Sequence, residues 1–307
     1  MAPTLLWIGL GNMGRGMCKN IVAKGKLSSP LLLYNRSSKK AVDLAAKLPA
    51  GRAEVIASLK QAISKADIIF TCVADDDAVQ HVFSVMLQTS VSGKLFIDCS
   101  TIHPDTTKSI AKDVTDAGGE FVAAPVFGAP AMADTGQLIG VLAGPRASVK
   151  KARPWFKGVV ARAEIDLSDQ PYSRATTLKV LGNTFVSSMV EQLAEAHVVV
   201  EKSGLGTDVF ASVRLAPISR PIHSLLDPDA HRRLLQAPGT TVRCRLARKD
   251  ARHAGSLAIS AGTEMKTLEI ADVHLAKVKL HCGEAGDIAG IYGAVREEAG
   301  LRFENDA

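Results

Sequence analysis

Residues 4–37 constrain the fold more than any other part of this chain. An apolar run, Leu5–Ile8, leads directly into Gly-Leu-Gly-Asn-Met-Gly at positions 9–14. The first glycine lets the chain turn sharply out of a strand, the second lets a pyrophosphate approach the backbone, and the third lets the next helix pack closely. Apolar residues then recur at helical spacing from Met17 onward. The pattern predicts a dinucleotide-binding strand, turn and helix; the alternative is a glycine-rich turn without a ligand.

A second group of residues bears on the choice of dinucleotide. The apolar run Leu31–Tyr34 ends where NAD enzymes usually carry Asp or Glu for the ribose 2′-hydroxyl. Here Asn35, Arg36 and Ser37 follow. A guanidinium can bind a 2′-phosphate through paired hydrogen bonds, whereas a carboxylate would repel it. We therefore expect NADP(H) to be preferred over NAD(H); the alternative is that Arg36 is only a surface residue in a turn.

Length and composition indicate a globular protein of two domains. The chain has 307 residues, of which 47% are hydrophobic, so each domain can have a core of its own. The apolar runs are too short to span a membrane, and the first strand begins almost at Met1. We therefore expect no transmembrane helix, no signal or transit peptide and a cytoplasmic location.

Several function classes are disfavoured by the residues present. The five cysteines form no CxxC pair and the histidines no HExxH arrangement, so we expect reduced thiols and no metal. The formal net charge of +6 suits an anionic cofactor and an anionic substrate. No basic run is interleaved with aromatic residues, which make up only 5% of the chain, so nucleic acid is not an expected partner.

Short apolar runs alternate with amphipathic segments over residues 1–166. This alternation predicts an α/β Rossmann domain, with a doubly wound, mostly parallel sheet and ligands beyond the carboxyl ends of the strands. The candidate strands are Leu5–Gly9, Leu31–Tyr34, Ile68–Val73, Leu95–Asp98, Phe121–Ala124 and Leu138–Ala143.

Residues 167–307 show no clear strand pattern and predict an all-α domain. A long helix is expected over 176–203, with further helices over 251–261 and 264–281. An apolar face on the long helix would be buried if the domain formed a homodimer or higher homo-oligomer.

Three later motifs resemble parts of a site. In Asp98–Pro104 the hydroxyls would lie at the carboxyl end of a strand, although Thr101 or His103 before a proline also suits a helix start. The small residues of 123–130 could turn backbone N–H groups toward an anion, or form a plain loop. Lys179 and Asn183 share one face of the long helix, and a partly buried lysine can exchange a proton, although most helical lysines only extend to the surface.

Together these motifs resemble the β-hydroxyacid dehydrogenase family, whose members include 3-hydroxyisobutyrate dehydrogenase and which is related to 6-phosphogluconate dehydrogenase. The resemblance covers about 1–210 and 246–303. The matching segments are GLGNMG at 9–14, DCSTIHP at 98–104, APVFGAP at 124–130, KVLGN at 179–183, Arg248-Lys249-Asp250, and Gly286-Asp287-Ile288 to Leu301.

The resemblance implies a Rossmann domain joined through a long helix to an all-α domain, with the active site in the cleft between them. It implies that Lys179 is the general acid/base and that Asn183 orients the substrate oxygen. The implied cofactor contacts beyond the glycine turn and Asn35–Ser37 are Val73, Ala74, Asp77, Thr101 and Lys249. The implied substrate contacts are Ser100, Phe127, Gly128 and Ala129. The glycine-turn contacts are Gly9, Leu10, Gly11, Asn12, Met13 and Gly14.

Two departures from the family pattern affect the expected function. Phe127-Gly128-Ala129 stands where the family commonly has Ser-Gly-Gly, so a hydroxyl donor is replaced by a phenyl ring. Residues 213–245 do not resemble the family, and a shifted reading frame or mis-spliced exon in the gene model would explain them. If the segment is genuine, activity could be impaired.

The expected activity is NADP(H)-dependent oxidoreduction of a small β-hydroxy acid or semialdehyde-type carbonyl. One alternative is an imine reductase-like enzyme on a less polar substrate, which Phe127 favours and Lys179 disfavours. Another is a catalytically impaired relative that serves as a binding or oligomerisation module. Loss of the lysine would mark the second alternative, and this chain retains Lys179.

Overall fold

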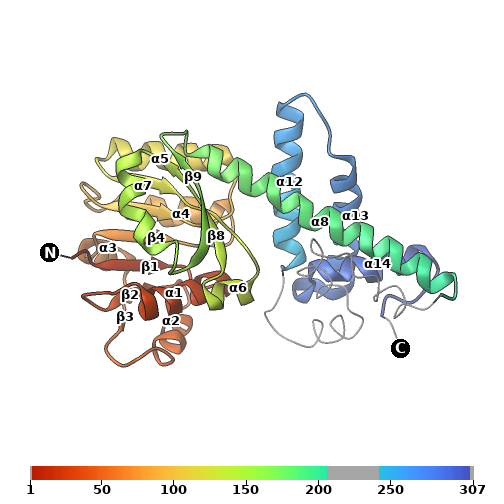
Figure 1. Ribbon diagram of the computed structural model, residues 1–307, viewed down its shortest axis with the longest axis horizontal. Helices are drawn as coiled ribbons and strands as arrows, with labels where there is room; N and C mark the ends of the chain where they lie inside the picture. The colour runs from red at the N-terminus through yellow and green to blue at the C-terminus, as the bar shows by residue number, and fades with distance from the viewer. Residues whose placement is uncertain (1, 206–241, 305–307) are drawn as a thin grey trace. The chain divides into compact units, whose positions relative to one another are not determined.

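The structure is a computed structural model that describes residues 2–205 and 242–304 (Figure 1). It comprises two compact units, Met1–Lys179 and Val180–Ala307. The divergent segment at 213–245 lies largely outside the described residues. The predicted division at 166/167 stays a prediction, since the compact units divide within a helix that follows it.

The first unit is built on one nine-stranded sheet in the order β3-β2-β1-β4-β5-β6-β8-β7, with β9 paired to β8. β1 to β6 are mutually parallel, β8 is antiparallel to both β6 and β7, and β9 is parallel to β8. The strand order reverses between β1 and β4, which makes this a doubly wound sheet with its ligand site expected at the carboxyl ends there. The strands are β1 Leu5–Ile8, β2 Leu31–Tyr34, β3 Ala53–Val55, β4 Ile68–Thr71, β5 Leu95–Asp98, β6 Glu120–Ala123, β7 Val126–Phe127, β8 Leu138–Gly144 and β9 Ala161–Ser168.

Helices cover both faces of this sheet, because the central strands are apolar on both sides. In β1, Leu5 and Trp7 belong to one buried cluster and Leu6 and Ile8 to another, on the opposite face. α1, α2 and α7 contribute to the first cluster, and α3, α4 and α5 to the second. The helices are α1 Asn12–Lys24, α2 Ser38–Ala45, α3 Leu59–Lys65, α4 Asp76–Met86, α5 Pro104–Asp116, α6 Pro130–Thr135 and α7 Arg146–Ala152.

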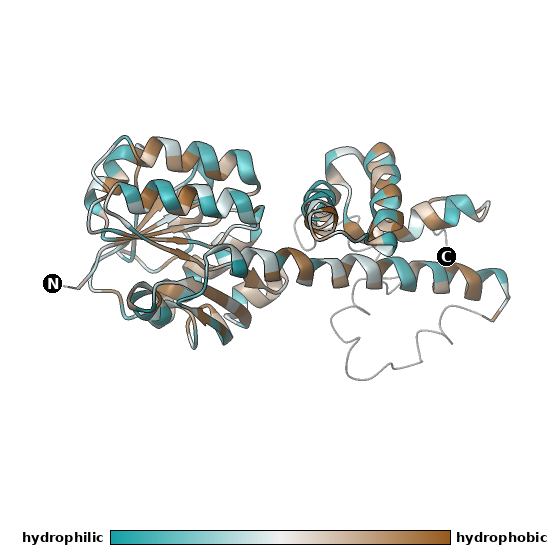
Figure 2. Cartoon of the chain, turned by 90° about the horizontal axis from the view of Figure 1, so that it is seen from above, coloured by the Kyte–Doolittle hydropathy of each residue, from teal (hydrophilic) through white to brown (hydrophobic). Residues whose placement is uncertain are grey.

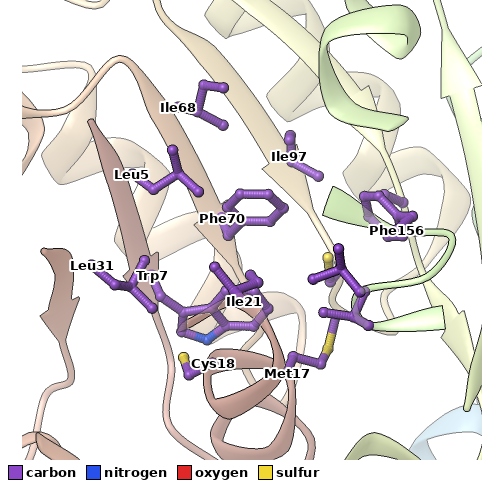
Figure 3. Packing of buried hydrophobic residues seen from close by; sticks show 14 of the residues in the cluster. Leu5, Trp7, Met17, Cys18, Ile21, Leu31, Ile68, Phe70, Ile97 and Phe156 are labelled. Carbon is purple, nitrogen blue, oxygen red and sulfur yellow. The ribbon is translucent and has the colours of Figure 1, made fainter. Parts of the chain in front are cut away.

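Aromatic rings fill the centre of the first cluster. The rings of Trp7 and Phe70 are stacked with their centroids 5.3 Å apart, and Phe156 lies beyond Phe70 at 6.5 Å. Figure 3 shows these rings with Ile21 of α1 in the same cluster. In Figure 2 the strands of this unit are mainly brown, as expected for a sheet buried on both faces.

The second unit is helical in its described residues, which contain no strand. α8, Ser173–Lys202, crosses the division between the units, and α12 Cys244–Ser260, α13 Lys266–Cys282 and α14 Ile291–Glu298 follow. Val190, Ala194, Leu275 and Ile291 lie in its main core. Within the described ranges, no helix is both long enough and apolar enough to cross a membrane.

The structure confirms the α/β Rossmann class with a helical second region. The predicted strands at Leu31–Tyr34 and Leu95–Asp98 match the observed ones, and the first ends one residue early, at Ile8. β3, β7 and β9 were not predicted. β9 is half exposed and alternates polar with apolar residues, so it has no apolar run to detect.

The helix predicted over 251–261 was too short at its start. α12 begins at Cys244, because its first buried positions are the small residues Cys244 and Ala247 among charged neighbours. Such a weakly apolar face gives little periodic signal.

Candidate active site

The glycine turn is held in place by two hydrogen bonds. The Gly9 N–H donates to the Tyr34 carbonyl at 3.2 Å. The indole N–H of Trp7, which is fully buried, donates to the Gly9 carbonyl at 2.9 Å. Gly9 has φ +97°, and a Cβ there would lie 2.2 Å from the Cys72 carbonyl oxygen. The turn therefore requires glycine at its first position for both conformational and steric reasons.

The other two glycines of the motif have different roles. A Cβ on Gly14 would lie 2.1 Å from the Gly9 carbonyl oxygen, so this position keeps α1 against the turn. A Cβ on Gly11 would meet nothing within 4 Å. Gly11 is the N-cap of α1, where the first N–H groups have no helical acceptor. Because this turn is open and presents backbone N–H groups, it fits the pyrophosphate of a dinucleotide. Its remaining residues are Leu10, Asn12 and Met13.

Asn35 connects the glycine turn to the end of β2. Its Oδ1 accepts a hydrogen bond from the Leu10 N–H at 2.8 Å, and its Nδ2 donates to the Ser37 carbonyl at 3.1 Å. The side chains of Arg36 and Ser37 are exposed beside it. Within the described part of the chain, Arg36 makes no hydrogen bond or ion pair. The guanidinium therefore extends into solvent next to the turn.

Two of the predicted contacts, Val73 after β4 and Ser100 after β5, meet in one hydrogen-bonded chain. The Val73 N–H donates to Ser100 Oγ at 3.0 Å, and the Ser100 hydroxyl donates to Asp98 Oδ1 at 2.8 Å. Ser100 is 1% exposed. Because a serine hydroxyl has one proton, Ser100 in this conformation uses it inside the protein. Ala74 and Asp77 are exposed near the start of α4, and Thr101 is half-buried.

The capping reading of Asp98–Pro104 is confirmed. His103 is the N-cap of α5, its Nδ1 accepts from the Asp105 N–H at 3.2 Å, and Pro104 is the first helical residue. The His103 N–H in turn donates to Asp76 Oδ1 at 2.8 Å. This segment therefore fixes the starts of both α4 and α5.

Phe127 and Lys179 lie together in the first unit. The ammonium nitrogen of Lys179 is 4.6 Å from the centroid of the Phe127 ring, and Lys179 is only 7% exposed. Phe127 ends β7, Gly128 follows with φ +135°, and Ala129 is the N-cap of α6. The lysine singled out from sequence is thus buried beside an aromatic ring, which is a cation–π contact.

Asn183 and Lys249 lie together in the second unit, on a shared carboxylate. Asn183 Nδ2 donates to Asp250 Oδ2 at 2.8 Å, and Lys249 Nζ is 3.1 Å from Asp250 Oδ1. Lys249 is 6% exposed. Asp250 was not among the predicted site residues, although its place in Arg248-Lys249-Asp250 marked it. The Trp7 indole was also missed, since no sequence spacing indicates a bond to Gly9.

The thiolate form is disfavoured in the cysteines near the turn. Burial and then the nearby Asp98 carboxylate raise the pKa of the Cys72 thiol to about 12, although Lys179 acts in the opposite direction. Burial likewise raises the pKa values of Cys18 and Cys99 well above the usual range. All three stay protonated at neutral pH. The residues that the structure describes also contain no cluster of His, Cys, Asp or Glu able to hold a metal ion.

Comparison with known proteins agrees with this geometry. Residues 4–168 match the family described as the NAD binding domain of 6-phosphogluconate dehydrogenase. An NADH-dependent oxidoreductase of Aspergillus ustus, ucdB, is 36% identical over 291 residues, which cover 95% of this chain and 98% of that protein.

Two solved structures share the fold over nearly the whole chain. The 3-hydroxyisobutyrate dehydrogenase of Mycobacterium tuberculosis, solved with L-serine, has a TM-score of 0.79 at 23% identity and covers 96% of this chain and 100% of its own. The protein Psf3, solved with NADP+ and 2-OPP, has a TM-score of 0.79 at 22% identity and covers 95% and 100%. The chain is an oxidoreductase that binds a nicotinamide cofactor, and it belongs to the family described by the NAD binding domain of 6-phosphogluconate dehydrogenase.

Proposed function

We propose that this protein transfers hydride between NADP(H) and the carbonyl carbon of a small molecule, a β-hydroxy acid or semialdehyde-type carbonyl in the first instance, with Lys179 as the general acid/base. The observation that carries the proposal is the buried ammonium of Lys179 in the same compact unit as the glycine turn. A lysine that is only 7% exposed is retained at a cost in desolvation, which a catalytic role would explain.

The chemistry divides simply between cofactor and protein. The reduced nicotinamide supplies the hydride that adds to the carbonyl carbon. Lys179 donates a proton to the carbonyl oxygen as that oxygen gains charge, and the neutral amine then takes a proton from solvent. In the oxidative direction the amine removes the hydroxyl proton. Asn183, one helical turn further along α8, is assigned to orient the same oxygen through its amide.

The proposed cofactor contacts follow the glycine turn and the strand ends beyond it. Arg36 supports a preference for NADP(H), because its exposed guanidinium is available for a 2′-phosphate. The structure of Psf3 contains NADP+, whereas the ucdB relative is named as NADH-dependent, so the side chain at position 36 carries this part of the proposal. The other proposed contacts are Val73, Ala74, Asp77, Thr101 and Lys249.

The test is to replace Lys179 with alanine and with arginine. Lys179→Ala should lower kcat by on the order of a hundredfold, because general acid catalysis contributes about that much. Lys179→Arg keeps the positive charge but cannot exchange a proton at neutral pH, so it should be nearly as slow. Cofactor affinity, measured by nucleotide fluorescence, should be unchanged in both variants. Full activity in either variant would remove Lys179 from the mechanism.

A second candidate is an imine reductase-like activity, which the Phe127 ring beside Lys179 favours. A panel of cyclic imines and semialdehydes assayed with NADPH separates the two. Faster turnover of an imine than of every carbonyl would favour the second candidate. Homo-oligomerisation and a cytoplasmic location remain predictions from the sequence.

A further inference from the structure

An aromatic ring lies beside the proposed proton donor. Lys179 Nζ lies 4.6 Å from the Phe127 centroid. A carbonyl oxygen that receives the lysine proton must come within about 3 Å of Nζ. When that oxygen approaches Nζ from the side of the ring, the groups attached to the carbonyl carbon lie beside the phenyl group. In that approach the ring contacts the substrate next to the reacting carbon.

The face of a phenyl ring selects among those groups. Its π electrons are attracted to cations, C–H groups and the edges of other rings, and are repelled by an anion placed over them. A carboxylate beside the reacting carbonyl would also lose hydration against an apolar ring. An aryl or alkyl substituent would instead bury apolar area there, at about 25 cal/mol per Å².

The cation beside the ring, Lys179, is committed to the carbonyl oxygen in the proposed function, and the other predicted substrate contacts offer a carboxylate little compensation. Ser100 gives its proton to Asp98 and accepts from the Val73 N–H, so its hydroxyl is already used in both directions. Gly128 and Ala129 have no polar side chain, and only their main-chain N–H groups could meet an anion. No side-chain hydroxyl is thus available at 127–129 to bind an acid.

The ring is held by the structure around it. Phe127 pairs with Ile139 in the sheet, and Gly128 lies close enough to Met132 and Leu138 that a Cβ would meet their side chains at 3.2 Å and 2.7 Å. α6, which follows, is fixed to α1 because Asn20 Nδ2 donates to the carbonyls of Ala133 at 2.8 Å and Asp134 at 3.1 Å. The same helix that opens at the glycine turn therefore also holds the segment that carries Phe127.

From these contacts we infer that Phe127 determines substrate specificity and selects aldehydes or ketones whose carbonyl substituent is an aryl or alkyl group that carries no carboxylate. The inference rests on the proposed function, since it needs Lys179 to protonate the carbonyl oxygen. It narrows the substrate class from small acids to apolar carbonyl compounds.

The test compares phenylacetaldehyde with succinic semialdehyde, assayed with the full-length protein and NADPH. Wild type should favour phenylacetaldehyde by about tenfold or more in kcat/KM, which is the discrimination expected from one apolar contact. Phe127→Ser should lose that preference by a similar factor, mainly through KM for phenylacetaldehyde. Phe127→Leu, the matched control, removes the ring but keeps an apolar side chain and should retain most of the preference against the acid.

The outcomes separate the two proposals. A wild-type preference for succinic semialdehyde, or an equal preference in wild type and Phe127→Ser, overturns the inference while leaving the oxidoreductase intact. Should Phe127→Ser fail to fold, Phe127→Leu and Phe127→Tyr still test it, since Tyr adds a hydroxyl donor and should raise kcat/KM for the semialdehyde. Cofactor binding without turnover of either aldehyde, or of any other carbonyl, overturns the proposed function together with the inference.

Discussion

The glycine turn at 9–14 and the loop at 124–130 serve the same unit but are determined in different ways. The turn is restricted by backbone sterics, since a Cβ on Gly9 or Gly14 would lie 2.2 or 2.1 Å from a carbonyl oxygen. At the loop the backbone path is less informative than one side chain, Phe127, which faces Lys179. Cofactor binding can therefore be inferred from glycine spacing, whereas the substrate choice that we propose depends on a single residue type.

The largest effect on stability is expected at Gly9. It distinguishes the structural role of Gly9 from the role of Gly11 in nucleotide binding. Gly9→Ala places a Cβ 2.2 Å from the Cys72 carbonyl oxygen at φ +97°. We expect it to lower the free energy of unfolding by about 2–3 kcal/mol or more, because overpacking and backbone strain add. Thermal or denaturant unfolding measures this directly.

Gly11→Ala is the matched control for that variant. A Cβ there meets nothing within 4 Å, so the stability of the protein without nucleotide should be almost unchanged. Nucleotide affinity should still fall by roughly tenfold or more, because the methyl group occupies the approach of the pyrophosphate. Equal stability losses in both variants would contradict the different roles assigned to these glycines.

An intermediate effect is expected at the cofactor's ribose. Arg36→Asp should weaken NADPH binding by about tenfold or more and NADH binding far less, because a carboxylate repels a 2′-phosphate and can accept from a 2′-hydroxyl. Fluorescence titrations with both nucleotides measure the ratio. If both affinities fell equally, Arg36 would not determine the preference for NADP(H). The NADH dependence in the name of the ucdB relative would then be the better guide to the cofactor.

The smallest effect is expected at Trp7, whose indole donates a hydrogen bond to the glycine turn. Trp7→Phe keeps a ring stacked on Phe70 but removes the N–H that donates to the Gly9 carbonyl at 2.9 Å. An unsatisfied buried acceptor costs about 1–3 kcal/mol, and nucleotide affinity should fall a few-fold as the turn loosens. Unchanged stability and affinity would show that the indole hydrogen bond is not needed to hold the turn.

These residues also show what could be predicted from sequence. The strands with continuous apolar runs, such as Leu31–Tyr34, were predicted correctly, because burial on both faces leaves a signal that needs no neighbours. β9 was not predicted, because its exposed alternating residues depend on pairing with β8. Other hydrogen bonds of the candidate site join residues that are distant in sequence, such as Asn20 with Ala133 and Asn183 with Asp250. Sequence spacing does not indicate such pairs.

Ser100 shows that a motif match does not determine which hydrogen bonds a side chain makes. Its place in the sequence predicts a substrate contact, but spacing cannot show that its proton is donated to Asp98. Phe127 is the opposite case. Its departure from the family motif already indicated a less polar substrate, and the structure places the Phe127 ring beside Lys179.

The most direct test of the account is deuteride transfer. NADPH carrying deuterium on the transferring carbon is incubated with the protein and the aldehyde panel, and the alcohols are analysed by mass spectrometry. The account predicts an alcohol with one deuterium on the carbinol carbon from wild type, and far slower incorporation by Lys179→Ala. Tight NADPH binding with no deuterium in any product would contradict it.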